Sequence, residues 1–323
     1  MSFLKIRGRP FAEPPFDRFF EFIAPNADRH RILKSLLKEL GIESLVFTVA
    51  GNRHFFIFPR REGPEPDNPP AGDRVFPFPG KNPVILTAHY DRAAGSPGAN
   101  DNSVAVFLLI KAAGLLRTSG TGNWITILTD KEELGPGEGI CSQGSYTLAE
   151  TLRRNGLGRG RIFIFDSCGT GDTLIVSSTA DYLFNDYSFS YFFNRAPKGL
   201  LKARQLTREL RIMALETARN LNMDKVLLLP TPFSEDAGFL KAGLAAVTIT
   251  ALPSREASSF VSLLRKRPDF PGALIARENR QAGDEPLIPE TWRRLNGPKD
   301  LPSRLTPEHY GGILRFAQQL CKN

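Results

Sequence analysis

The stretch Val84-Ile85-Leu86-Thr87-Ala88-His89-Tyr90-Asp91 joins a short apolar run directly to a histidine and an aspartate. Further short apolar runs follow along the chain, at residues 124–128, 162–165 and 245–249. The segments between these runs have helical character, most clearly at 103–117 and 206–221. Strands that are apolar along their whole length are buried on both faces, which is typical of parallel strands covered by helices. The sequence therefore predicts a mainly parallel, mixed sheet sandwiched by helices in a three-layer α/β/α fold.

The segment before the first of these strands is predicted to contain a helix and a hairpin. Apolar residues recur at helical spacing between residues 27 and 40, and Gly41 stands where a helix is expected to end. Residues 44–49 and 54–58 have strand-like composition around a turn at 50–53. An amphipathic helix followed by two antiparallel strands is therefore expected at this end of the chain.

The length of 323 residues fits one α/β domain spanning 1–323. Residues 60–80 are rich in proline, glycine and charge, which predicts a surface loop. Residues 254–289 form a polar, proline-containing segment that we interpret as an insertion near the site. The segment 307–320 is predicted to be a final packing helix.

The composition is that of an ordinary globular protein. Lys and Arg exceed Asp and Glu by 42 − 34 = +8, but the basic residues are scattered, so no nucleic-acid partner is expected. Cys141, Cys168 and Cys321 are too few and too widely spaced for a disulfide framework, which predicts free thiols. The N-terminus lacks a signal-type apolar segment, and no run of about 18 apolar residues occurs, so no membrane partner and a cytoplasmic location are expected.

Residues with metal-binding side chains follow three of the predicted strands. The carboxyl ends of parallel strands meet at one edge of a sheet, so these side chains are expected to lie together. The residues are His89 and Asp91 after the first strand, Asp101 near the start of the helix predicted from residue 103, Glu132 and Glu133 after the second strand, and Asp166 after the third. Taken singly, each has an ordinary explanation as a loop, turn or cap residue. Together they provide the imidazole and carboxylate ligands of a zinc-activated hydrolase, and a further carboxylate, Glu132, to accept the proton of water.

The sequence at this point resembles the M28 family of zinc aminopeptidases, of the bacterial leucyl aminopeptidase type, whose fold is shared by glutaminyl cyclases. The resemblance rests on the order of His89-Tyr90-Asp91, Gly98-Ala99-Asn100-Asp101-Asn102, Glu132-Glu133, Gly144-Ser145-Tyr146 and Asp166. It implies that Asp101 bridges two zinc ions and that His89 and Asp166 complete the ligands of one of them. It also implies that Glu133 binds the other ion and that Glu132 is the general base. Asp91 is then the partner that fixes the tautomer of His89.

One position departs from the family pattern. The family usually has its last zinc ligand in a segment similar to His-Thr-Pro-x-Asp-Thr, and the matching stretch here is Asn296-Gly297-Pro298-Lys299-Asp300. Asn296 therefore stands where the histidine is expected. An amide oxygen is a poor zinc ligand compared with imidazole, so one zinc is expected and the second metal should be weak, replaced or absent. His309 lies near Asn296 in the sequence and is the histidine that could serve as a zinc ligand in its place.

The leading functional hypothesis is a metal-dependent aminopeptidase acting on peptide substrates. A second hypothesis, motivated by Asn296, is a degenerate family member that binds a peptide or partner without turnover. A third is an acyltransferase of the glutaminyl-cyclase type. It ranks lowest because its single zinc would need the ligand that is missing at Asn296.

Overall fold

The computed structural model describes residues 13, 15–60, 81–185, 198–275, 280–281 and 283–322. The predicted surface loop 60–80 lies outside these residues, apart from residue 60. Cys141 is exposed, Cys168 and Cys321 are buried, and all three are free thiols, as predicted.

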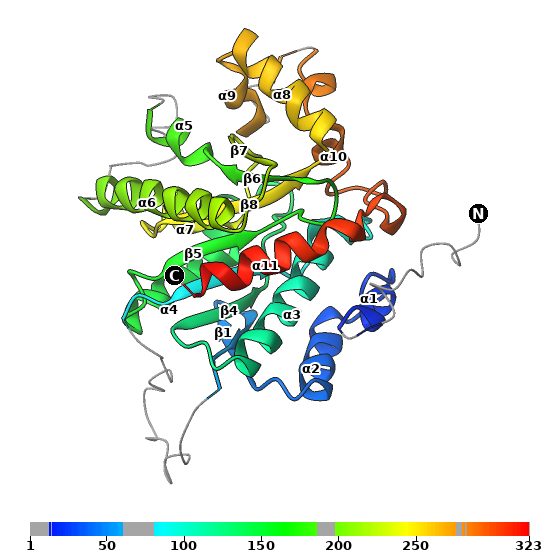
Figure 1. The fold of residues 1–323 in the computed structure, drawn as a ribbon, viewed down its shortest axis with the longest axis vertical. Helices are drawn as coiled ribbons and strands as arrows, with labels where there is room; N and C mark the ends of the chain where they lie inside the picture. Colours follow the sequence, from blue (N-terminus) through cyan, green and yellow to red (C-terminus); the bar gives the residue numbers. More distant parts are fainter. Residues whose placement is uncertain are drawn as a thin grey trace.

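Eight strands in the described part of the chain form one mixed sheet (Figure 1). They are β1 (Ser44–Val49), β2 (Asn52–Ile57), β3 (Val84–His89), β4 (Trp124–Thr129), β5 (Arg161–Phe165), β6 (Thr173–Ser177), β7 (Val226–Leu229) and β8 (Ala246–Leu252). Their order across the sheet is β1-β2-β4-β3-β5-β8-β6-β7. The central strands β4, β3, β5 and β8 are mutually parallel, whereas β2 and β6 pair antiparallel to them. The parallel centre directs the carboxyl ends of β3, β4 and β5 to the same edge.

Helices connect these strands. They are α1 (Phe19–Phe22), α2 (Arg29–Glu39), α3 (Val104–Thr118), α4 (Gly144–Arg154), α5 (Thr179–Asn185), α6 (Lys198–Asn220), α7 (Glu235–Lys241), α8 (Ser254–Lys266), α9 (Phe270–Ile275), α10 (Glu290–Arg293) and α11 (Tyr310–Leu320). Short 3-10 turns lie at Phe16–Arg18, Ile140–Ser142, Glu285–Leu287, Pro302–Arg304 and Pro307–His309. A turn at Ala99–Ser103 leads into α3.

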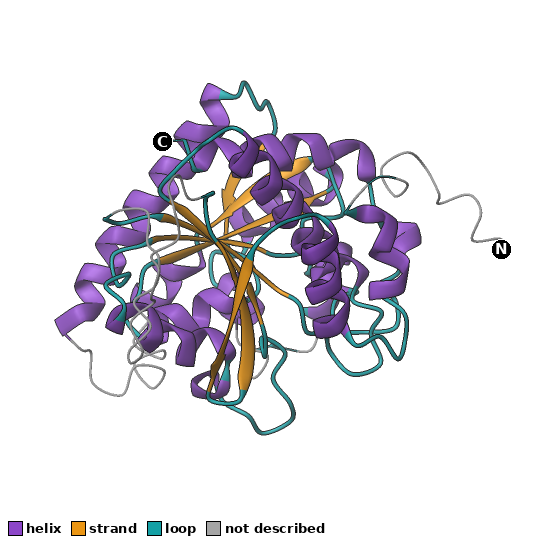
Figure 2. Cartoon of the chain, turned by 90° about the horizontal axis from the view of Figure 1, so that it is seen from below, coloured by secondary structure: helices purple, strands orange, loops and turns teal. Residues whose placement is uncertain are grey.

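The two faces of the sheet are covered by different helices, as Figure 2 shows with the strands passing between them. Successive side chains of a strand point to opposite faces. In β3, Val84 and Leu86 join the core formed with α2, α3, α6 and α11, whereas Ile85 joins the core formed with α4 and α7. All of β3 is buried because both faces are covered. This is the predicted three-layer α/β/α fold.

Several element boundaries differ from the sequence prediction. The hairpin between β1 and β2 turns on only two residues, Ala50 and Gly51, both with positive φ, so β2 begins at Asn52 rather than at residue 54. The helix predicted from residue 206 begins eight residues earlier, at Lys198. The strands β6 and β7 were not predicted.

The segment interpreted as a polar insertion, 254–289, contains α8 and α9. Its buried side chains pack with Trp292 of α10 in a small separate core. By length and composition, Ala99–Thr118 is the one described helical segment that could cross a membrane, but 83% of its apolar 18-residue window is buried inside the protein, where α3 is a core helix.

Candidate metal centre

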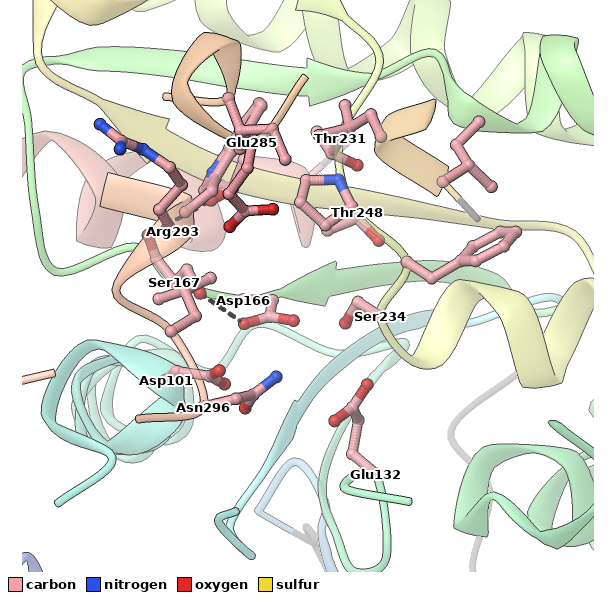
Figure 3. A pocket seen from close by; sticks show the side chains of 18 of the residues that line it. Asp101, Glu132, Asp166, Ser167, Thr231, Ser234, Thr248, Glu285, Arg293 and Asn296 are labelled. Carbon is pink, nitrogen blue, oxygen red and sulfur yellow. Dashed lines mark hydrogen bonds between the residues drawn. The ribbon is translucent and has the colours of Figure 1, made fainter. Parts of the chain in front are cut away.

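The predicted site residues converge at the carboxyl edge of the parallel strands. His89 is the last residue of β3, Asp166 directly follows β5, and Glu132 and Glu133 lie in the loop after β4. Asp101 reaches the same edge from the turn that precedes α3. Figure 3 shows the carboxylates of Asp101, Glu132 and Asp166 facing a common space.

Three of these side chains form a buried group with the geometry of a metal site. His89, Asp101 and Asp166 each offer a ligand atom, and these atoms lie within 4.8 Å of one another. The Nε2 atom of His89 is 3.1 Å from Asp101 Oδ1 and 3.9 Å from Asp166 Oδ1. Both ring nitrogens of His89 are fully buried without a hydrogen-bond partner among the described residues. An imidazole and two carboxylates are ligands that zinc takes, and a bound ion would satisfy the orphaned Nε2.

The charges of the buried carboxyl groups of Asp101 and Asp166 favour the binding of a cation between them. Burial raises the pKa of Asp101 above its ordinary value, and the neighbouring carboxylate of Asp166 raises it further. Burial acts in the same direction on Asp166, but the facing His89 holds the pKa of that carboxyl below its ordinary value. Acidic groups gathered in a buried space repel one another, and a bound cation relieves that repulsion.

Asp91 supports the group from behind. Its Oδ1 atom lies 3.4 Å from Nδ1 of His89, the ring nitrogen that faces away from Asp101. Its two oxygens also accept hydrogen bonds from the backbone N–H groups of Glu132, at 3.1 Å, and Glu133, at 3.0 Å. Asp91 is therefore placed to orient both the imidazole and the loop that carries the two glutamates, as expected of a residue behind a metal ligand.

Glu132 and Glu133 have different surroundings although they are adjacent. Glu132 faces the group, with its Oε2 atom 4.0 Å from His89 Nε2. Burial raises the pKa of Glu132 well above its ordinary value, and the facing His89 opposes that rise. Burial, followed by the charge of Asp101, raises the pKa of Glu133 to about 8.

Asn296 lies between Glu133 and Asp101. In the amide orientation that gives every polar atom a partner, its Nδ2 atom donates to Glu133 Oε1 at 2.5 Å and Oε2 at 2.9 Å, and lies 2.9 Å from Asp101 Oδ2. The side-chain amide therefore presents hydrogen-bond donors to the two carboxylates that would hold a second metal. Figure 3 shows Asn296 beside Asp101.

Two residues that were not assigned from the sequence hold the loop that leads from His89 to Asp101. The first is Asp300, which is buried and accepts hydrogen bonds from the backbone N–H groups of Asn100, at 2.9 Å, and Asp101, at 3.0 Å. Burial raises its pKa to about 7, and the charge of Asp101 contributes. Asp300 belongs to the stretch that was aligned with the family motif, which is the signal that could have identified it.

The second is Arg29 of α2, which is buried beneath the loop between His89 and Asp101. Its Nη1 atom donates to the carbonyl oxygens of Tyr90, at 3.0 Å, and Asp91, at 3.1 Å. Its Nη2 atom donates to the carbonyl of Pro97, at 2.9 Å, and to Ser103 Oγ, at 3.1 Å. Arg29 therefore ties the beginning of the loop to its end. No local sequence pattern marks it as a site residue.

A cavity of about 220 Å³ opens onto the carboxylates. Leu274 and Ile275 of α9 and Trp292 of α10 give it an apolar wall, and Ser234, at the start of α7, lines another side. The segment 254–289 thus contributes to the wall, as the sequence indicated. His309 is not part of this cavity, because it lies beside Glu308 and lines a different one.

Comparisons with known proteins show what the sequence and the fold are similar to. A model of peptidase family M28 matches residues 75–219, which confirms the resemblance seen in the motifs. The LapA aminopeptidase of Legionella pneumophila is similar over 100% of this chain and 74% of its own, with 11% identity and a TM-score of 0.55. A glutaminyl cyclase of an Acidobacteriales bacterium is similar over 95% of this chain and 92% of its own, with 11% identity and a TM-score of 0.52. These likenesses show the fold.

A zinc aminopeptidase of Bacillus subtilis is similar over 83% of this chain at 17% identity, with a TM-score of 0.47. This chain spans 48% of that protein, about half of its length. No curated protein matches the chain by sequence.

Proposed function

We propose, from the match of residues 75–219 to the model of peptidase family M28, that this chain is a metal-dependent exopeptidase that removes N-terminal residues from peptides. The observation that carries the proposal is the buried group of His89, Asp101 and Asp166, with the carboxylate of Glu132 beside it. We further propose that these three residues hold a single zinc ion.

The residues divide the chemistry between them. A zinc ion bound there supplies a Lewis acid that polarises the peptide carbonyl and makes water more acidic. Glu132 takes a proton from the attacking water onto its carboxylate and passes it to the nitrogen of the leaving amine. A raised pKa, which burial gives Glu132, suits a group that must both accept and return a proton near neutral pH.

The size of the cavity supports cleavage at a chain end. About 220 Å³ is less than the roughly 300–1,000 Å³ of pockets that enclose a drug-sized ligand. Helices α9 and α10 close one side of it with Leu274 and Trp292. Such a space fits a terminal residue better than a peptide that continues in both directions.

Metal analysis of the purified protein, combined with assays on a panel of aminoacyl amides, tests the proposal. We expect one zinc per chain and hydrolysis that a chelator removes and added zinc or cobalt restores. Free N-terminal substrates should be cleaved, and their N-acetylated forms should not. A protein that binds no zinc and shows no hydrolysis with either metal would contradict the proposal.

Asn296 favours a second candidate, a protein that binds peptides without turnover. Its amide occupies the place of a ligand and satisfies Glu133 by hydrogen bonding instead. Hydrolysis that disappears in Glu132→Gln, while peptide binding and folding persist, would exclude this candidate.

The similarity to glutaminyl cyclases makes their chemistry a further alternative to test. Ligation by Asp101, Glu133 and a histidine at position 296 would suit it, but Asn296 removes that third ligand. We therefore expect no pyroglutamate when the protein is incubated with a peptide that begins with glutamine.

A further inference from the structure

Gln143 is a buried residue whose side-chain amide contacts Glu132. It lies directly before α4, is only 4% exposed, and its Nε2 atom is 3.1 Å from Glu132 Oε1. The same nitrogen lies 3.4 Å from the backbone carbonyl of Glu132 and 3.5 Å from that of Ser234. Every acceptor near Nε2 therefore belongs to the proton-carrying glutamate or to the cavity wall.

The orientation of this amide is fixed from its other side. The Oε1 atom of Gln143 accepts hydrogen bonds from Ser145 Oγ, at 2.8 Å, and from the backbone N–H of Gly238, at 3.0 Å. Because the Gly238 N–H can only donate, a reversed amide would set two donors against each other. The NH₂ group must consequently face Glu132.

The packing around Gln143 leaves little freedom for it to move. A Cβ atom on Gly238 would lie 2.6 Å from Gln143 Oε1, and one on Gly144 would lie 1.9 Å from the carbonyl oxygen of Asp130. The backbone N–H of Gly144 also donates to the carbonyl of Lys131, at 2.7 Å, which joins the start of α4 to the loop of Glu132. The absence of side chains at both glycines lets α4, α7 and this loop approach closely.

The two carboxylate oxygens of Glu132 thus have different partners. Oε1 accepts the hydrogen bond from Gln143, whereas Oε2 points toward the metal-binding group, 4.0 Å from His89 Nε2. A carboxylate anchored through one oxygen presents the other in a fixed direction, which is what proton transfer within hydrogen-bond reach requires.

We propose that Gln143 is a positioning residue for the peptidase reaction: it holds Glu132 Oε1 so that Oε2 faces the water, and it links Glu132 to the cavity wall at Ser234. The proposal rests on the proposed function for its kinetic consequences, but the placement of Glu132 can be measured without activity. Gln143 is not among the described residues that line the cavity, and its NH₂ group contacts Glu132, so it acts through Glu132.

Gln143→Met tests this inference, because methionine has a similar length and no hydrogen-bonding amide. We expect kcat per zinc-loaded chain to fall on the order of 10²-fold, as for misplacement by about 1 Å, with KM changed less than about threefold. Zinc content should stay at the wild-type value. Glu150→Gln is the control, since Glu150 is exposed on α4, where it pairs with Arg153 and Arg154, and its kcat should stay within about threefold of wild type.

Gln143→Glu is the second variant: it keeps an acceptor for Ser145 and Gly238 and replaces the NH₂ donor with a carboxyl oxygen, which repels the Glu132 carboxylate. We expect the same loss of kcat from Gln143→Glu. This variant tests the inference if Gln143→Met fails to fold. A purely structural role would instead lower the unfolding temperature and the zinc content and leave kcat per loaded chain unchanged. Unchanged kcat per loaded chain in a folded Gln143 variant would overturn the inference.

Crystal structures of the wild type and of a folded Gln143 variant separate this inference from the proposed function. We expect the Glu132 carboxylate to leave its wild-type position in the variant. A carboxylate that stays in place refutes the positioning role, whatever the activity. A wild-type protein without zinc-dependent hydrolysis refutes the proposed function, even where the carboxylate moves.

Discussion

Glu132 and Glu133 are adjacent in the sequence and face different partners, so substitution at each should have a different effect. Glu132 lies beside the group of His89, Asp101 and Asp166 but is not one of its members. Glu132→Gln keeps the shape of the side chain and removes its capacity to take a proton. We expect kcat to fall by about 10²–10⁴-fold, with zinc content unchanged, measured by kinetics and metal analysis on the same samples.

Glu138→Gln is the control for this substitution. Glu138 is in the same loop but exposed, where it pairs with Lys131 at 2.7 Å. Exposed ion pairs contribute little, about 0–1 kcal/mol, so activity should be retained. Equal activity of Glu132→Gln and wild type would remove Glu132 from the proposed mechanism.

Asn296 is a second position at which one residue decides a property of the site. Its Nδ2 atom lies 2.9 Å from Asp101 Oδ2 and also donates to Glu133. Asn296→His places an imidazole nitrogen, a good zinc ligand, beside two carboxylates. We expect bound zinc to rise from one to two per chain, measured by elemental analysis and by anomalous scattering from crystals.

Asn296→Ala should still bind one zinc, since it adds no ligand. Two zinc ions in the wild type, or one in Asn296→His, would show that Asn296 does not determine the number of metals. In both Asn296→His and Asn296→Ala, the affinity for the first zinc should change little, because His89, Asp101 and Asp166 are retained.

Among the helices and strands, the strands whose side chains are buried on both faces could be predicted from the sequence. The strands β3, β4 and β5 are mostly apolar because both of their faces are buried, and this shows in their sequence. The strand β6 has an apolar run of only three residues, Leu174 to Val176, between the polar Thr173 and Ser177, so its sequence resembled a loop. The strand β7 has four residues and includes the exposed Leu228, and a run of that length does not distinguish a strand from a helix end.

Helix α2 has a role that its amphipathic pattern does not reveal. Arg29, its first residue, makes three hydrogen bonds to backbone carbonyls of the loop between His89 and Asp101, and a fourth to Ser103 just after it. Arg29→Met leaves buried acceptors unpaired, which should lower the free energy of unfolding by on the order of 3 kcal/mol. Because the loop carries two ligands, zinc affinity should fall by about 10–100-fold, measured by competition with a chelator.

Arg31→Met is the matched control, since Arg31 is exposed on the same helix. It should change neither stability nor zinc affinity appreciably. Wild-type zinc affinity in a folded Arg29→Met protein would show that α2 does not support the site.

At the scale of the whole molecule, the site is assembled from segments that are distant in the sequence. The residues at the ends of β3, β4 and β5 were predictable, because strand ends mark where polar side chains gather. Gln143, Asp300 and Arg29 were not assigned, because their partners depend on how α4, the segment before α11 and α2 pack against those ends. Hydrogen bonds such as that from Asp101 N to Asp300, 199 residues away, leave no local pattern.

The stability of the metal-free molecule should depend on Glu235, which lies beneath the site at the start of α7. It is 1% exposed, and its Oε1 atom has no hydrogen-bond partner within the described part of the chain. Burial raises its pKa from 4.5 to about 7. At pH values between these two pKa values, Glu235 is protonated in the folded protein and ionised in the unfolded chain. The free energy of unfolding therefore falls as pH rises from about 4.5 to about 7, by up to about 3 kcal/mol.

Glu235→Gln removes this titration, so its stability relative to wild type should increase from pH 5 to pH 8. Urea unfolding of both proteins at several pH values, with a chelator present, measures the difference, since metal binding would add its own pH dependence. Glu209→Gln, at an exposed position of α6, should stay parallel to wild type throughout. If the Glu235→Gln and wild-type curves are also parallel, Glu235 is ionised in the folded protein at the same pH as in the unfolded chain, and its burial does not govern the acid–base behaviour of the fold.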